Sequence, residues 1–126
     1  MTSGNAAGGA PFPAVVRAGG LVYTSGLACI DPATMAPRVA DFDGQCRDVL
    51  AQLDAALDDT GCRREHVVKL ECFLAERKYY PAWNAAFVEF FGAHPPARTT
   101  IVTTLPAEGL LIEVQAVASV AAPHRL

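Results

Sequence analysis

The stretch 95–120 constrains the fold more strongly than any other part of the chain. Residues 97–105 are rich in β-branched side chains that alternate with other residues, and residues 110–120 alternate again. The Pro-Ala-Glu-Gly segment at 106–109 supplies turn residues between the two runs. The pattern predicts a β-hairpin whose second strand has one apolar face, while Glu113 lies on the other face.

Two charged residues fall on the strands of this predicted hairpin, and we expect both on its half-buried side. Arg98 would fix a carboxylate through two parallel charge-assisted hydrogen bonds, and Glu113 would accept a proton or hold a water molecule. Symmetric pairing sets Arg98 opposite Val117, so a substrate or a water would separate the two charges, or they would lie in different subunits. The alternative is an ion pair on the surface, which contributes well under about 1 kcal/mol.

Length and composition are those of one domain with a hydrophobic core. Of the 126 residues, 52% are hydrophobic, which exceeds the usual share for a soluble domain. No apolar run reaches the roughly 18 residues of a membrane span, so the apolar excess predicts contacts between subunits. The net charge of −3 provides no electrostatic basis for binding nucleic acid. We therefore expect neither a membrane nor a nucleic acid as a partner.

The cysteines and the N-terminus indicate the cellular compartment. The four cysteines and three histidines are scattered without a CxxC pair or metal-ligand spacing, so no metal is expected. Cys29 has no neighbouring base and is expected to be buried and inert. The first residues lack the features of a secretory signal, which predicts a cytoplasmic protein with reduced thiols. Residues 1–10 are expected to form a flexible tail, and residues 11–126 form the domain.

Two amphipathic segments separate the remaining predicted strands. Residues 41–60 and 79–91 repeat apolar side chains at helical spacing, and strands are expected at 14–17, 21–25 and 66–75. The polar face of the first helix is expected to include Gln45 and Arg47, and the apolar stripe of the second to include Tyr80, Trp83, Phe87, Phe90 and Phe91. The third strand is expected to bury Val68, Leu70, Cys72 and Leu74 and to direct Lys69 and Glu71 to the opposite side. The order predicts an α+β fold with a mostly antiparallel or mixed sheet, two helices on one face, and Arg98 and Glu113 on the other face.

Several motifs of this sequence resemble the RidA family (YjgF, YER057c, UK114). The most specific are PPARTT at 95–100 and LPAEGLLIEVQAVA at 105–118, and the segments RAGGLVYTSG, QCRDVLAQLDAALDDTG, HVVKLECFLA and WNAAFVEFFG add to them. The resemblance covers roughly residues 11–120. It implies a chorismate-mutase-like protomer that forms a homotrimer with clefts between subunits and needs no cofactor.

The resemblance also implies an activity, the hydrolysis of reactive enamines and imines such as 2-aminoacrylate and 2-iminopropanoate to 2-keto acids and ammonia. Arg98 would bind the substrate carboxylate, assisted by the backbone amide of Gly26. Glu113 would position and activate the water, and the backbone of Thr100 would line the pocket. An iminium carbon is already electrophilic, so orientation and a held water suffice. On the residues alone, Gly26 either admits a ligand close to the backbone or merely ends a strand.

The sequence departs from the family pattern at several positions of the expected pocket. Phe12 replaces a common tyrosine, Leu27 a glutamine, Thr100 a cysteine or serine, and Gln115 a second glutamate. A more apolar pocket at Phe12 raises a second possibility, a pathway-specific enzyme acting on a larger, aminomuconate-type imine or a biosynthetic intermediate. A third is a non-catalytic trimer that binds small carboxylates. A fourth, a ribonuclease, is disfavoured by the absence of a basic patch with interleaved aromatic residues.

Overall fold

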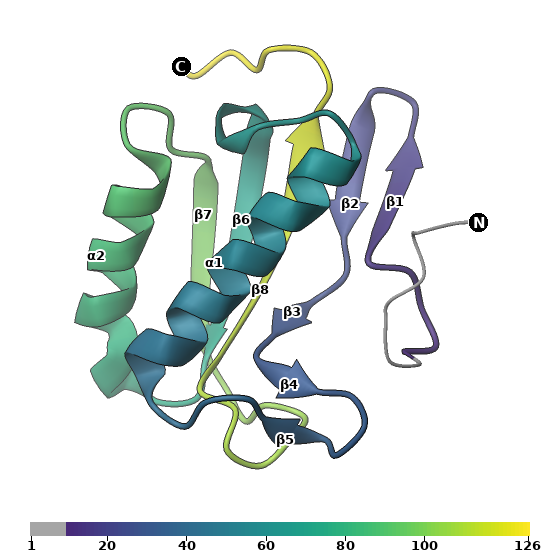
Figure 1. Cartoon of the computed structure of the whole chain (residues 1–126). Coiled ribbons are helices and arrows are strands. Elements are labelled where there is room, and N and C mark those ends of the chain that lie inside the picture. The colour runs from purple at the N-terminus through teal and green to yellow at the C-terminus, as the bar shows by residue number, and fades with distance from the viewer. Residues whose placement is uncertain (1–9) are drawn as a thin grey trace.

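A mixed β-sheet forms the frame of the computed structural model, which describes residues 10–126 (Figure 1). Its strands follow the spatial order β1-β2-β8-β6-β7, and β3 pairs with β8 beyond the end of β2. Only β6 and β7 run parallel, and all other pairs are antiparallel. The strands are β1 (Val15–Ala18), β2 (Leu21–Thr24), β3 (Leu27–Ala28), β6 (Val67–Leu74), β7 (Ala97–Val102) and β8 (Ile112–Ser119). A separate arm is formed by β4 (Ile30–Asp31) and β5 (Ala36–Pro37).

Both predicted helices are present, and they lie together on one face of the sheet (Figure 1). Helix α1 (Phe42–Asp59) begins at Asp41, whose carboxylate accepts a hydrogen bond from the backbone N–H of Gly44. Helix α2 (Tyr80–Phe91) follows a short 3₁₀ turn, η2 (Arg77–Tyr79), and another, η1 (Arg64–His66), precedes β6. Gly61 and Gly92 follow the two helices with φ angles of 76° and 57°, which a glycine adopts without strain.

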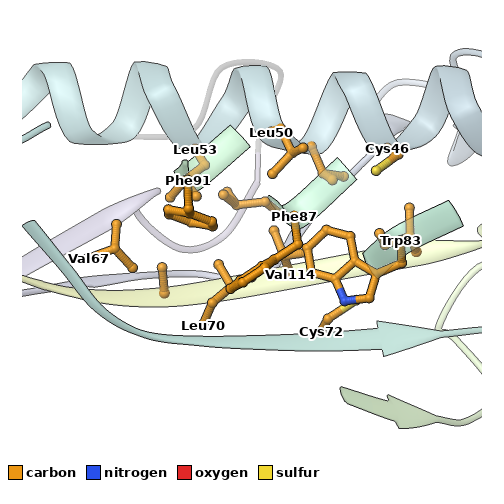
Figure 2. Close-up of a cluster of buried hydrophobic side chains, with 14 of the residues drawn as sticks. Cys46, Leu50, Leu53, Val67, Leu70, Cys72, Trp83, Phe87, Phe91 and Val114 are labelled. Carbon is orange, nitrogen blue, oxygen red and sulfur yellow. The ribbon is translucent and has the colours of Figure 1, made fainter. Parts of the chain in front are cut away.

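The hydrophobic core fills the space between the helices and the sheet. Figure 2 shows Leu50 and Leu53 of α1 facing Leu70 and Cys72 of β6, with the aromatic side chains of α2 in the same layer. The most completely buried side chains include Val49, Leu53, Leu70, Cys72, Leu74, Trp83, Ile112 and Val114. Each large apolar side chain that is removed from water in this way contributes about 1.5–3 kcal/mol. The alternation on β8 places its apolar residues in this layer, as the sequence predicts.

The predicted hairpin between residues 97–105 and 110–120 is wrong, because β6 lies between β7 and β8. The connection 103–111 passes over the end of β6 and is bonded to it at both ends. The N–H of Thr103 donates to the carbonyl of Leu74, and the N–H of Ala75 donates to the carbonyl of Leu111. Pairing on both edges satisfies the backbone groups of β6, a strand whose helix-facing side is fully buried.

Two further expectations about side-chain direction are wrong. A register shift between Val67 and Lys69 marks a bulge that turns Val67, rather than Val68, into the core. Gln45, expected on the polar face of α1, is fully buried. Its amide donates to the carbonyls of Val39 and Gly109 and accepts from the N–H of Leu111, so it holds the loop before β8. A buried amide with all these partners is stable where an unpartnered one would not be.

Cys29 is fully buried, as expected. Apart from Ala10, the predicted tail 1–10 lies outside the described residues. Within residues 10–126, no helix combines the length and the apolar character that crossing a bilayer requires.

Candidate active site

Arg98 lies on the edge strand β7 and is held by helix α2. In the parallel pairing of β6 and β7, Arg98 is level with Leu70, so both side chains point to the face that the helices cover. The Nη1 atom of Arg98 donates to Asn84 Oδ1 at 3.0 Å, and Nη2 donates to the hydroxyl of Tyr80 at 2.9 Å. The guanidinium carbon is also 4.7 Å from the centroid of the Phe87 ring. Helix α2 therefore fixes the orientation of the guanidinium.

The guanidinium of Arg98 has further N–H donors that can bind a ligand. An arginine has five N–H donors, and the hydrogen bonds to Asn84 and Tyr80 use two of them. Arg98 is half-buried at the rim of the protomer, and the rings of Phe87 and Tyr80 lie near it. Partial desolvation strengthens its attraction for an anion. The arrangement suits a small carboxylate that approaches from the edge of the sheet.

Glu113 lies on β8 and points to the open face of the sheet, opposite Phe73 of β6. Its carboxyl group is half-buried. Burial disfavours the charged form and raises the pKa of Glu113 above its ordinary value, and no charged neighbour among residues 10–126 contributes to that shift. A carboxylate with a raised pKa is a better proton acceptor than an exposed one, so Glu113 suits a general base.

Gly26 leaves the room that the Glu113 carboxylate occupies. A Cβ atom at position 26 would overlap Glu113 Oε2 and would lie 3.1 Å from its carboxyl carbon. The neighbouring Ser25 binds the N-terminal segment through its hydroxyl, which donates to the carbonyl of Pro13 at 2.7 Å, and through its N–H, which donates to Ala14. These bonds bring the segment that carries the exposed Phe12 beside the end of β2, next to Gly26.

The structure divides the predicted site residues between two faces, and the expectation that Arg98 and Glu113 share a face is wrong. Arg98 is level with Leu70, and Glu113 is level with Phe73, and these two positions of β6 point to opposite sides. Thr100 lies on the side of Arg98, where its hydroxyl accepts a hydrogen bond from the indole of Trp83 at 3.3 Å. Within one protomer, therefore, the Arg98 guanidinium and the Glu113 carboxylate do not meet.

The open face around Glu113 also carries bonded polar side chains. The amine of Lys69 donates to the Thr99 hydroxyl at 2.9 Å, and the Gln115 amide donates to Glu71 at 2.6 Å. Lys69 and Glu71 thus point away from the core, as the sequence predicts. Residues 10–126 contain no group of three or more histidine, cysteine or acidic side chains arranged to hold a metal.

The two α2 residues that hydrogen-bond Arg98 do not stand out in the sequence. Helical spacing places Tyr80 in the apolar stripe of the helix, yet Tyr80 is 43% exposed and its hydroxyl accepts a hydrogen bond from the guanidinium. Asn84 was not singled out. The available signal is the spacing of the two residues, because positions i and i+4 share a helix face. The spacing indicates a contact with Arg98 only when the position of α2 beside β7 is known.

Comparison with known proteins identifies the family. The family model described as endoribonuclease L-PSP matches residues 4–120 of this chain. The chain belongs to this family, the RidA family. The resemblance seen in the sequence is thereby confirmed.

Individual members of the RidA family match over most of the chain. The 3-aminoacrylate deaminase RutC of Acinetobacter baylyi is 32% identical over 111 residues, which is 88% of each chain. The crystal structure of RidA from an Antarctic Psychrobacter has a TM-score of 0.80 at 27% identity and covers 94% of this chain and 96% of its own. The YjgF structure from E. coli has a TM-score of 0.76 at 28% identity, covering 86% and 87%. The predicted fold, two helices on one face of a mixed sheet, is confirmed.

Proposed function

We propose that this member of the RidA family is an imine deaminase, which hydrolyses 2-imino carboxylates and 2-aminoacrylate-type enamines to 2-keto acids and ammonia. The observation that carries the proposal is Glu113, a half-buried carboxylate with a raised pKa that lies against the backbone of Gly26. The similarity to a protein named as an aminoacrylate deaminase supports the reaction class. The orientation of Arg98 by α2 supports a substrate that carries a carboxylate.

The proposed chemistry uses only side chains of this chain. Arg98 binds the substrate carboxylate, which fixes the position of the adjacent C=N carbon. As a water oxygen forms its bond to that carbon, Glu113 accepts a proton from the water. Glu113 then returns that proton to the nitrogen of the tetrahedral intermediate. As the C–N bond breaks, the new hydroxyl group gives its proton to Glu113, so that ammonia leaves and the C=O bond of the keto acid forms. The step starts from the protonated imine, and an enamine enters it as its imine tautomer. A positioned general base of this kind contributes about 100- to 10,000-fold in rate.

The proposed site joins two subunits of a cytoplasmic homotrimer, because one protomer cannot bring its own Arg98 and Glu113 together. The edge strand β7 of one subunit supplies Arg98 with the backbone of Thr100, and the open face of the next supplies Glu113 with Gly26 and the Phe12 segment. Large apolar side chains exposed on or beside the open face favour its coverage by another copy. They include Val16, Leu21, Tyr23 and Ile101.

A trapping assay tests the proposal. An amino-acid oxidase acting on alanine generates 2-iminopropanoate, semicarbazide traps the imine, and a deaminase suppresses the trapping. We expect suppression by wild type and its loss in Arg98→Ala and Glu113→Gln, whereas Arg77→Ala and Glu108→Gln, at exposed positions, retain it. Absence of suppression by folded wild-type protein would reject the generic deaminase activity.

The alternative functions predict other results. A pathway-specific enzyme would act only on a bulkier imine and not on 2-iminopropanoate, and Phe12→Tyr would restrict that activity further. A carboxylate-binding protein would bind keto acids through Arg98 without turnover and without a need for Glu113. A nuclease, the activity named in the family description, would cleave RNA at a rate that falls steeply with salt.

A further inference from the structure

Tyr80 differs from the other aromatic residues of α2. Trp83, Phe87 and Phe91 are buried in the core, whereas Tyr80 is 43% exposed. Its hydroxyl oxygen accepts a hydrogen bond from Arg98 Nη2 at 2.9 Å. The ring of Tyr80 also lies near the guanidinium, with 5.6 Å between the ring centroid and Cζ. The phenol is therefore at the solvent edge of the guanidinium and not in the core.

The hydrogen bond from Arg98 leaves the phenol proton of Tyr80 available. A tyrosine hydroxyl has one donor besides its acceptor lone pairs, and a guanidinium has no acceptor. The O–H bond of Tyr80 is therefore directed away from Arg98 and can serve another acceptor. The adjacent positive charge polarises the hydroxyl, which strengthens its donation to an anion.

We propose that Tyr80 is a substrate-binding residue that donates to the same carboxylate as Arg98, an inference that rests on the proposed function of this site. The remaining N–H groups of Arg98 and the O–H of Tyr80 hold the two carboxylate oxygens. Asn84 fixes the guanidinium from the Nη1 side, and the Phe87 ring lies against it. Arg98 and Tyr80 together therefore present three or more donors to a substrate carboxylate.

This role has a specific kinetic consequence. The carboxylate keeps its charge throughout the reaction, so Tyr80 binds it equally in the ground state and in the transition state. Tyr80→Phe keeps the ring and removes only the hydroxyl. We expect it to raise KM, and the Kd for a keto acid, about tenfold while kcat changes by less than about twofold. A displaced Arg98 would instead lower kcat as well.

Calorimetric titration of the intact protein with pyruvate, together with the trapping assay, tests the proposal. Wild type, Tyr80→Phe and Arg98→Ala are compared with Tyr79→Phe, a matched control whose ring stacks on Phe42 with 4.6 Å between centroids. We expect weaker binding in the first two variants and unchanged binding in the control. Equal pyruvate affinity of Tyr80→Phe and wild type, a loss of kcat without a rise in KM, or no binding by wild type would each overturn the proposal. Pyruvate binding that depends on Tyr80, without imine turnover, would support this role and reject the deaminase activity instead.

Discussion

Arg98 and Glu113 point to opposite faces of one sheet, on two strands that β6 separates. The backbone of β6 fills the space between the two strands, so a change of rotamer cannot bring the guanidinium and the carboxylate onto one ligand. A reaction that uses both groups therefore requires Arg98 from one copy of the chain and Glu113 from another.

Mixing two inactive variants tests this arrangement. Arg98→Ala keeps Glu113, and Glu113→Gln keeps Arg98, so one of the three clefts in every mixed trimer would contain both native residues. Random assembly of equal amounts would restore about a quarter of wild-type activity, as the cyclic symmetry of a trimer dictates. The measurement is imine trapping after co-expression or co-refolding of the two variants.

The double variant Arg98→Ala/Glu113→Gln is the control for this experiment. Mixed with either single variant, it leaves every cleft without one of the two groups, so activity stays absent. Recovery in the first mixture alone supports a site between subunits. If mixed trimers form but remain inactive, the composite site is wrong.

Gly26 offers a second test, because its missing side chain makes room for Glu113. We expect Gly26→Ala to displace the Glu113 carboxylate and to lower kcat at least about tenfold, since a base must stay within hydrogen-bond reach of its water. The matched control is Gly20→Ala, whose new Cβ would meet only Val120 Cγ2 at 3.8 Å, an ordinary contact. Equal activity of the two alanine variants would show that the close approach of Gly26 and Glu113 has no functional role.

Local periodicity accounts for most of what the sequence predicted correctly. Both helices and the main strands follow from side-chain spacing and from Gly61 and Gly92, features that each segment carries by itself. Strand pairing depends on distant segments instead, and the turn-like residues at 106–109 suggested a hairpin where a longer connection passes over the end of β6. The wrong expectation that Arg98 and Glu113 share a face follows from the wrong pairing of β7 with β8. The contact between Tyr80 and Arg98 depends on the position of α2 beside β7, which no local pattern contains.

The burial of Gln45 also depends on contacts with distant segments, and it leads to a prediction about stability. Three partly buried backbone groups lose their side-chain partner in Gln45→Leu, which is expected to lower the free energy of unfolding by about 2 kcal/mol. Arg47→Leu, at an exposed position of the same helix, is expected to change it by less than about 0.5 kcal/mol. Urea denaturation measures the free energy of unfolding of both variants. Similar losses in the two variants would contradict a special role for the Gln45 hydrogen bonds.

The raised pKa of Glu113 predicts opposite effects of pH on activity and on stability. Activity requires the carboxylate, so kcat/KM should fall as the pH drops through the folded-state pKa, which lies above the ordinary glutamate range. Stability changes in the opposite direction. As the pH rises from the ordinary glutamate pKa to the raised value, the unfolded chain loses the Glu113 proton while the folded state still holds it. The free energy of unfolding therefore decreases across this window, and the loss is complete above it.

Glu113→Gln replaces the titrating carboxyl group with a neutral amide. The variant should be inactive, yet it should unfold at a higher temperature than wild type near neutral pH, and the difference should shrink in acid, where the wild-type carboxyl is also neutral. Thermal melts at neutral and acidic pH, with Glu108→Gln at an exposed position as the control, measure the difference. A constant difference at both pH values would mean that Glu113 does not titrate as a desolvated group. The partial burial that stabilises the neutral acid is thus the same property that makes the ionised group a stronger base.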